Sequence, residues 1–350
     1  MKKTDGYGRV VYGILLCAAV VLLTGCGGDS AIRGRDYEEN EADAEAQILP
    51  KDKDLSGEQT PVVTDQSGPQ EKNEAETKVG RQDDQAEPVI MDADWAEYFN
   101  GLHGTAVLYD ATDRQYTMYN RELALTQRSP CSTFKIVSSL IALENGVINI
   151  EDSLRNWSGE IFWNENWNRD IAFGDAFRVS CVWYFREVID DIGKERMQRE
   201  LDSLQYGNCD ISDWEGKLNT NNTNRALTGF WIESSLEISP KEQVEVMERI
   251  FGEDSAYTEK SRHELKQVML VSETEETDIL MYGKTGMGKA QGIVVDAWFT
   301  GFAVSGEKTV YYCVRLGQTD GAEVSSQKAK EIAIRIVADY YGGYASVDRK

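Results

Sequence analysis

The stretch Ser129-Pro130-Cys131-Ser132-Thr133-Phe134-Lys135-Ile136 places a serine at the start of an apolar run, with a lysine three residues later. If the run is helical, Ser132 and Lys135 lie one turn apart on the same face, within reach of each other. A serine hydroxyl is a weak nucleophile until a base takes its proton, and a neutral lysine, or a derivative of it, can be that base. Because serine and lysine are common residues, the significance of this pair depends on the rest of the chain.

The composition limits the classes of function that fit this chain. It has 350 residues, a formal net charge of -23 and 41% hydrophobic residues, which suits one large domain or two small ones. A strongly acidic protein is not expected to bind nucleic acid or anionic lipid by charge. The two histidines, His103 and His263, have no partner at metal-ligand spacing. This argues against a histidine metal site and a Ser-His-Asp triad, although one histidine could still serve in a triad.

The N-terminus has the features of an export signal. Three basic residues, Lys2, Lys3 and Arg9, come before a mostly apolar segment over residues 10–23, which is too short for a comfortable membrane span. The segment ends in Leu23-Thr24-Gly25-Cys26, which resembles the bacterial lipobox. We therefore predict a lipoprotein signal peptide over residues 1–25, a lipid on Cys26, and attachment to the outer face of a bacterial cell membrane. An ordinary signal peptide and an uncleaved anchor are the alternatives.

A change of composition near residue 93 divides the rest of the chain. Residues 27–92 are rich in Asp, Glu, Gln, Gly and Ser, with almost no aromatic residues, so this part cannot bury enough apolar surface to fold. We predict that residues 26–92 comprise the lipidated cysteine and an acidic, disordered tether. All eight tryptophans lie beyond it, and residues 93–350 suit a single α/β domain.

Strands are predicted near both ends of this domain and helices in its middle. A period of two predicts strands over residues 104–109, 116–120, 279–283, 293–304 and 309–316. Apolar spacing and capping residues predict helices over residues 94–99, 132–144, 182–192, 195–204, 240–251, 261–271 and 326–341. This order favours one mostly antiparallel sheet covered by helices, in the α/β (α+β) class.

Three further motifs contain polar residues at the ends of predicted elements. Ser180-Cys181-Val182 opens a helix, and Tyr206-Gly207-Asn208 forms a polar turn after another helix. Gly283-Lys284-Thr285-Gly286 lies at the end of an apolar strand. Each motif is weak separately, because such turns are common. Their combination with Ser132 and Lys135 is more specific.

In chain order, Ser-Thr-Phe-Lys, Ser-x-Val, Tyr-Gly-Asn, Phe-Trp and Lys-Thr-Gly resemble the motif set of the class D serine β-lactamases, the oxacillinases. The resemblance covers nearly all of residues 94–350. It implies the serine β-lactamase and penicillin-binding-protein transpeptidase fold, with a mostly antiparallel central sheet flanked by helices plus a helical region. It also implies hydrolysis of β-lactam antibiotics such as penicillins, so the expected partner is a small molecule.

The resemblance assigns roles to the polar residues of these motifs. Ser132 would attack the lactam carbonyl and form an acyl-enzyme, while its own N–H and that of Met287 would bind the oxyanion. Ser180 and Lys284 would pass a proton to the lactam nitrogen, and Lys284 and Thr285 would face the substrate carboxylate. The remaining motif residues are the substrate-binding Gly286 and the supporting Tyr206, Gly207 and Asn208.

The resemblance also implies that Lys135 is an N6-carboxylysine, formed with CO2 or bicarbonate, and no metal or other cofactor is expected. Carboxylation needs the neutral amine, and burial lowers the pKa of a lysine by disfavouring its charged form. Val182, Phe134 and Ile232 are apolar residues suited to that desolvation. Trp231 matches the family tryptophan whose indole N–H holds the carbamate. The modified lysine would act as general base in both acylation and deacylation.

Two departures from the family pattern concern substrate binding. Residues 219–224, nearly all Asn and Thr, look like an insertion near the site. The family usually has a C-terminal arginine that grips the substrate carboxylate, and residues 327–332 contain none. Lys328 or Lys330 would then substitute as a point charge, and Arg315 is a weaker alternative.

Four cysteines remain in the folded part after Cys17 and Cys26 are assigned to the signal and the lipid site. Export would permit disulfides, and four cysteines allow three pairings between which the sequence cannot choose. We favour free, buried thiols that pack as small apolar residues. The four are Cys131, Cys181, Cys209 and Cys313.

Two other functions would use the same serine and lysine. A β-lactam sensor would be acylated once and stop, but the chain has one short apolar segment and no His-Glu-x-x-His, unlike receptors that join such a domain to membrane helices and a protease. A cell-wall D-Ala-D-Ala peptidase would not need Val182 and Trp231 around a carbamate. Acylation is common to all three functions, whereas deacylation separates them.

Overall fold

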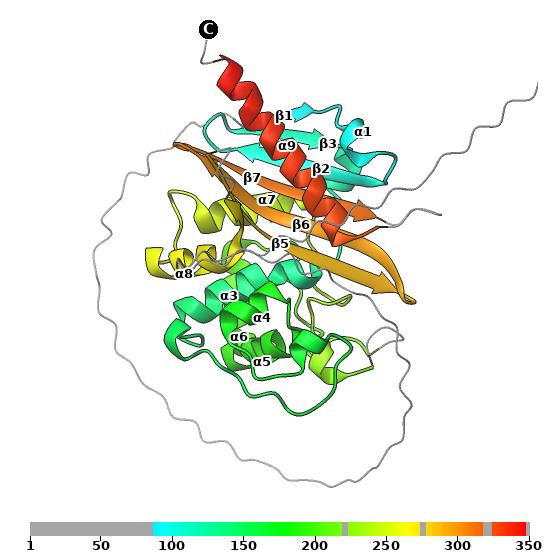
Figure 1. The fold of residues 1–350 in the computed structure, drawn as a ribbon, viewed down its shortest axis with the longest axis vertical. Coiled ribbons are helices and arrows are strands. Elements are labelled where there is room, and N and C mark those ends of the chain that lie inside the picture. Colours follow the sequence, from blue (N-terminus) through cyan, green and yellow to red (C-terminus); the bar gives the residue numbers. More distant parts are fainter. Residues whose placement is uncertain (1–86, 219–222, 274–277, 318–323, 348–350) are drawn as a thin grey trace, which may run out of the picture. The chain divides into compact units, whose positions relative to one another are not determined.

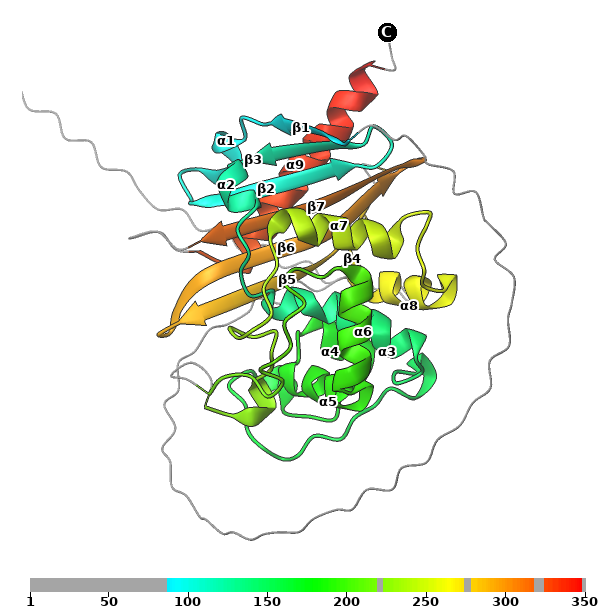
Figure 2. The same cartoon turned by 180° about the vertical axis from the view of Figure 1, so that it is seen from behind.

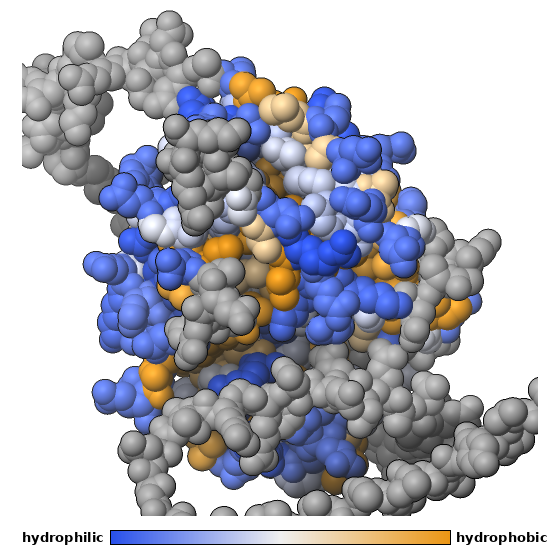
Figure 3. Space-filling view, turned by 45° about the horizontal axis from the view of Figure 1, so that its top comes forward, coloured by the Kyte–Doolittle hydropathy of each residue, from blue (hydrophilic) through white to orange (hydrophobic). Residues whose placement is uncertain are grey.

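The computed structural model describes residues 87–218, 223–273, 278–317 and 324–347, and the following structural statements concern these residues. The predicted signal peptide, the lipid site at Cys26 and nearly all of the predicted tether lie outside them and stay predictions. Within the described part, no helix is both long and apolar enough to cross a membrane. The face seen in Figure 3 is mostly hydrophilic, with smaller groups of hydrophobic residues between the polar ones.

A mixed sheet forms the centre of the described domain (Figure 1), with the strand order β1-β3-β2-β7-β6-β5-β4. Every neighbouring pair is antiparallel except β1 and β3, which are parallel. This confirms the mostly antiparallel sheet. The strands are β1 (Val89–Asp92), β2 (Gly104–Asp110), β3 (Gln115–Tyr119), β4 (Leu270–Glu273), β5 (Ile279–Ala290), β6 (Ile293–Ser305) and β7 (Lys308–Gly317).

Helices cover both faces of the sheet, because alternate residues of its strands point to opposite sides. On β6, Trp298 and Phe302 belong to a core shared with α3 (Lys135–Glu144), α5 (Val182–Ile192), α6 (Lys194–Leu204), α7 (Pro240–Phe251) and α8 (Glu259–Met269). Ala297 and Phe299 belong to a second core shared with α1 (Ala96–Phe99) and α9 (Ser326–Val347). Figures 1 and 2 show α9 on one face of the sheet and α7 on the other.

The remaining helices are short and lie between these elements. They are α2 (Arg121–Ala124), α4 (Phe173–Arg178) and the 3₁₀-helices η1 (Cys131–Phe134), η2 (Ile150–Asp152), η3 (Glu165–Trp167) and η4 (Arg225–Leu227). The predicted helix over residues 182–192 is confirmed with both bounds as α5. The predicted capping box at the start of α7 is also confirmed, because Ser239 and Glu242 exchange side-chain and backbone hydrogen bonds there.

The folded domain begins at β1, four residues before the predicted boundary at Ala93. Residues Val89–Asp92 pair with β3 at the edge of the sheet, and all four are exposed. An exposed edge strand buries little apolar surface, so its sequence shows no alternation of buried and exposed positions. The composition alone therefore placed this strand in the tether.

Strand β5 is longer than predicted, and a short strand, β4, was not predicted. The predicted strand over residues 279–283 continues to Ala290, so Lys284-Thr285-Gly286 lies inside β5 and not at its end. The glycines that suggested a turn instead allow close packing: a methyl group on Gly283 would lie 2.8 Å from the Thr300 carbonyl oxygen of β6. The helix predicted over 261–271 ends at Met269, and β4 follows directly.

Candidate active site

Ser132 and Lys135 are brought together by the turn at which η1 continues into α3. Lys135 Nζ donates a hydrogen bond to Ser132 Oγ at 3.0 Å. The predicted contact across one helical turn is confirmed, with the first turn in 3₁₀ geometry. A neutral amine at this distance can accept the hydroxyl proton, which is the geometry that a general base requires.

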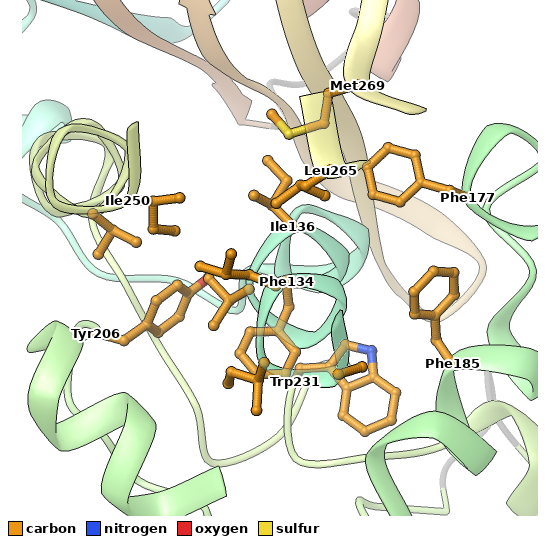
Figure 4. Close-up of a cluster of buried hydrophobic side chains, with 14 of the residues drawn as sticks. Phe134, Ile136, Phe177, Phe185, Tyr206, Trp231, Ile250, Leu265 and Met269 are labelled. Carbon is orange, nitrogen blue, oxygen red and sulfur yellow. The ribbon is translucent and has the colours of Figure 1, made fainter. Parts of the chain in front are cut away.

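The Lys135 side chain lies in an apolar pocket and is 1% exposed. Its Nζ is 5.4 Å from the centre of the Phe185 ring of α5. Burial disfavours the charged ammonium and, together with the nearby Lys284 charge, lowers the pKa of Lys135 to about 7. Figure 4 shows Phe134, Trp231 and Phe185 among the buried side chains of this region. Near neutral pH, a substantial fraction of Lys135 is therefore uncharged and able to act as a base.

Residues 131–133, named the nucleophile turn after the predicted role of Ser132, are held by hydrogen bonds from two sides. Cys131 has a left-handed φ of 49°, and its N–H donates to the Trp231 carbonyl at 3.0 Å. On the other side, Thr133 Oγ1 accepts a hydrogen bond from Gln243 Nε2 of α7 at 2.9 Å, and both side chains are buried. These bonds fix the two neighbours of Ser132, so Ser132 is presented by a rigid turn.

Strand β5 packs directly against this turn. A methyl group on Gly286 would lie 2.9 Å from Thr133 Cγ2 and 3.0 Å from the Pro130 carbonyl oxygen, so only glycine fits. Lys284 Nζ lies 3.3 Å from Thr285 Oγ1 of the same strand. The structure thus brings Lys284, Thr285 and Gly286 to the side of Ser132, as predicted. Met287 follows Gly286 on β5, and its oxyanion role stays a prediction.

Ser180 lies in the junction between α4 and α5, in the left-handed region with a φ of 55°. The preceding carbonyl, that of Val179, accepts a hydrogen bond from Trp167 Nε1 at 3.0 Å, which holds this junction in place. Ser180 Oγ is buried and has no hydrogen-bond partner among the described residues. Lys284 Nζ lies 5.8 Å from the ring of Phe177, three residues before Ser180, so the two predicted proton-transfer groups share one region.

Trp231 is fully buried, and its ring lies 6.1 Å from that of Phe134. Within the described segments 87–218, 223–273, 278–317 and 324–347, its Nε1–H has no hydrogen-bond partner. An unpaired buried donor costs free energy, so a polar group is expected to face it when the site is complete. Val182 and Ile232 are half-buried and pack against the same core.

The Tyr206-Gly207-Asn208 motif supports the segment that carries Trp231. Tyr206 is buried against Phe134, with ring centres 5.5 Å apart. Gly207 has a φ of 53°, and a methyl group on it would lie 2.0 Å from the Glu237 carbonyl oxygen. Asn208 donates from Nδ2 to the Ser235 carbonyl at 2.9 Å. The motif thus positions the chain after Trp231.

The structure corrects the suggested grip of Arg315 on a substrate carboxylate. Arg315 is 5% exposed, and its Nε donates to Asp296 Oδ1 at 2.8 Å. This guanidinium is therefore already paired inside the core. Lys328 and Lys330 lie on α9, which packs against the face of the sheet opposite to α3. Near Ser132, Lys135 makes a direct contact, and the charge of Lys284 lies close enough to lower the pKa of Lys135.

All four cysteines of the domain are free, as predicted. Cys131, Cys181 and Cys313 are buried, whereas Cys209 is half-buried. The predicted insertion lies mostly outside the described residues, at 219–222. Its last residue, Asn224, caps η4 by accepting a hydrogen bond from the Ala226 N–H.

Two residues of the site were missed by the sequence analysis, namely Gln243 and Glu233. A buried glutamine on the apolar face of α7, beside Val244 and Met247, is a signal that could have identified Gln243. Glu233 follows the buried Trp231 by two residues, and its carboxylate accepts a hydrogen bond from the Lys289 N–H of β5. No sequence pattern predicts a contact between residues this far apart.

Comparison with known proteins gives concordant matches. A family model for the penicillin-binding protein transpeptidase domain matches residues 104–338. The probable β-lactamase YbxI of Bacillus subtilis is 34% identical over 243 residues, which cover 69% of this chain and 82% of YbxI. A solved class D β-lactamase from Bacillus subtilis is similar with a TM-score of 0.61 and 31% identity, covering 71% of this chain and 95% of that one.

A second group of relatives consists of receptors. The regulatory protein BlaR1 of Bacillus licheniformis is 30% identical over 258 residues, which cover 73% of this chain. The matched part is 40% of BlaR1, so this chain is similar to less than half of that protein.

Proposed function

Because the chain belongs to the penicillin-binding protein transpeptidase family, among the class D β-lactamases and their relatives, we propose that Ser132 is acylated by β-lactams and that the acyl-enzyme is then hydrolysed. The observation that carries this proposal is the 3.0 Å contact between Ser132 Oγ and the buried Nζ of Lys135. In this contact the proposed nucleophile meets a lysine with a pKa of about 7, so much of its amine is neutral at neutral pH and can take part in proton transfer.

The acylation step follows from these positions. Ser132 Oγ attacks the lactam carbonyl carbon and gives its proton to Lys135. The negative charge that forms on the carbonyl oxygen is stabilised by the backbone N–H groups of Ser132 and Met287. The carbon–nitrogen bond of the lactam then breaks, and the nitrogen takes a proton from the Ser180 hydroxyl, which Lys284 replenishes. Lys284 and Thr285 bind the substrate carboxylate.

Deacylation requires a base that activates water at the same acyl group. We propose that Lys135 is carboxylated and that its carbamate would serve as the base in both acylation and deacylation, and two properties of the site fit that group. The lowered pKa of Lys135 supplies the neutral amine that reacts with CO2, and the Trp231 Nε1–H is a buried donor that lacks a described partner. When present, the carbamate supplies carboxylate oxygens that can accept a proton from water.

The alternative function is that of a β-lactam sensor, in which the acyl-enzyme persists. The similarity to BlaR1 over 73% of the chain favours this alternative specifically. Both functions use the same acylation step, because both begin with the attack of Ser132. They differ in the fate of the ester.

Steady-state turnover of a chromogenic cephalosporin and a penicillin separates the two functions. We expect many substrate molecules to be hydrolysed per protein molecule, at a rate that rises when bicarbonate is added, because bicarbonate keeps Lys135 carboxylated. The control is Ser132→Ala, which removes the nucleophile and should be inactive. A stoichiometric burst followed by no further hydrolysis, with or without bicarbonate, would contradict the hydrolase proposal and favour the sensor.

A further inference from the structure

Glu233 has a strained backbone conformation beside the proposed site. Its φ of 50° lies in the left-handed region, which non-glycine residues rarely adopt. Two other non-glycine residues with this conformation, Cys131 and Ser180, adjoin or form part of the proposed catalytic machinery. Backbone strain of this kind persists where surrounding contacts enforce it, and it is frequent at functional sites. The contacts that hold Glu233 are therefore informative.

The backbone of Glu233 is tied to the nucleophile turn. Its N–H donates to Ser129 Oγ at 2.9 Å, and Ser129 Oγ donates to the Trp231 carbonyl at 3.0 Å. The same Trp231 carbonyl accepts the Cys131 N–H at 3.0 Å. Residues 231–233 and 129–131 thus form one hydrogen-bonded unit that ends at Ser132.

The side chain of Glu233 is hydrogen-bonded to strand β5, on the opposite side of the site from the nucleophile turn. Its carboxylate accepts a hydrogen bond from the Lys289 N–H of β5. The ladder between β5 and β6 is irregular at this point, because Gly288 pairs with Asp296 whereas Lys289 pairs with Val294. A β-bulge leaves a strand locally less constrained by its neighbour. A carboxylate bound to a backbone N–H makes a strong, charge-assisted hydrogen bond there.

Strand β5 and the nucleophile turn lie close together. A methyl group on Gly288 would lie 3.1 Å from Cys131 Sγ and 3.9 Å from Glu233 Oε1. Strand β5 therefore runs close to both the residue before the nucleophile and the Glu233 carboxylate. Met287, whose N–H is proposed to bind the oxyanion, directly precedes Gly288.

We propose that Glu233 is a positioning residue for the oxyanion-binding strand. Its backbone binds the nucleophile turn and its carboxylate binds β5. In this way Glu233 clamps the two elements together and sets the distance between Ser132 and the Met287 N–H. The proposal rests on the proposed acylation of Ser132. Because an oxyanion contact strengthens in the transition state, the clamp acts on the rate of acylation more than on substrate binding.

The test measures acylation by a fluorescent penicillin in rapid-mixing experiments, which separate the dissociation constant of the first complex from the acylation rate constant. For Glu233→Ala we expect an acylation rate constant about 10- to 100-fold below that of the wild type, since small displacements of catalytic groups have effects of this size. The dissociation constant should change less than about threefold. Glu233→Gln keeps an oxygen that can accept the Lys289 N–H, and should recover most of the rate. Glu237→Ala removes a carboxylate four residues further along the same segment, and as the matched control it should acylate as the wild type does.

A further variant separates positioning from stability. Glu233→Gly removes the carboxylate but relieves the left-handed strain, so it should melt at or above the temperature of Glu233→Ala and yet acylate equally slowly. A wild-type acylation rate in Glu233→Ala, a loss confined to the dissociation constant, or recovery of the rate in Glu233→Gly would each overturn the proposal. If the wild-type protein itself is not acylated, the proposed function fails, and that outcome is distinct from these.

Discussion

Replacing Lys135 with methionine should reduce the rate of Ser132 acylation by about 100- to 10,000-fold, since general-base catalysis typically contributes a factor of this size. Methionine fills a similar volume but has no group that can accept the serine proton. Lys135→Ala should lose the same activity, with an added loss of stability from the cavity. The measurement is the acylation rate with a fluorescent penicillin.

A matched control for this substitution is Lys266→Met on α8. Lys266 is a half-buried lysine whose pKa is likewise lowered by burial, but its Nζ lies 5.8 Å from the Phe251 ring and 5.4 Å from the Phe302 ring, away from Ser132. The Lys266→Met variant should be acylated at the same rate as the wild type. If Lys135→Met is acylated at a rate close to that of the wild type, the assignment of Lys135 as the base is wrong.

The lowered pKa of Lys135 also gives this prediction a pH dependence. Protonation of the amine below about pH 7 removes the free base and also prevents carboxylation, so the acylation rate should fall as the pH falls through about 7 and level off above it. The folded protein binds fewer protons than the unfolded chain between about pH 7 and the ordinary lysine pKa of 10.5, so the free energy of unfolding should rise with pH across this window. Lys135→Met should lose this contribution. A wild-type acylation rate that does not change between pH 6 and 8 would contradict the assignment.

Replacing Trp231 with phenylalanine should slow deacylation by about 10- to 100-fold, because a hydrogen bond to a charged group is worth about 1.5–3 kcal/mol. The ring of phenylalanine keeps much of the packing against Phe134 and Phe230 but removes the Nε1–H that we propose to hold the Lys135 carbamate. Acylation should be much less affected, so the acyl-enzyme should accumulate. Mass spectrometry during turnover measures the acylated fraction directly.

Trp298 provides the control for this substitution. It is also fully buried, and its Nε1–H likewise lacks a partner within the described part of the chain. It lies on β6 beside Arg315, with the guanidinium 5.5 Å from its ring, and has no proposed role in the reaction. Trp298→Phe should leave the ratio of acylation to deacylation rates unchanged. If Trp231→Phe and Trp298→Phe behave alike, Trp231 does not act on the carbamate.

The parts of the fold that follow from local rules were predictable from the sequence. Helix α7 begins with a capping box and proline, and its bounds were correct. The contact of Ser132 with Lys135 needs only one helical turn, so the motif itself predicts it. Features that depend on distant packing were not predictable. The continuation of β5 through three glycines depends on β6 and the nucleophile turn, which the local sequence does not reveal.

The same distinction applies to the charged residues of the site. Arg315 is nineteen residues from Asp296 in sequence, and only the register of β6 against β7 places the two side chains together. Glu233 reaches Lys289 across an even longer separation. Local patterns therefore predicted the contact between Ser132 and Lys135, whereas the contacts that surround this pair could be seen only in the tertiary structure.

The central claim is that a β-lactam forms an ester with Ser132, assisted by Lys135. Mass spectrometry of the full chain mixed with a penicillin tests it most directly. Ring opening leaves both halves of the penicillin attached, so we predict a mass increase equal to one whole penicillin molecule, located on the peptide that contains Ser132. The adduct should disappear once the penicillin is consumed. An adduct on a peptide without Ser132, or the absence of both adduct and penicillin hydrolysis, would contradict the account.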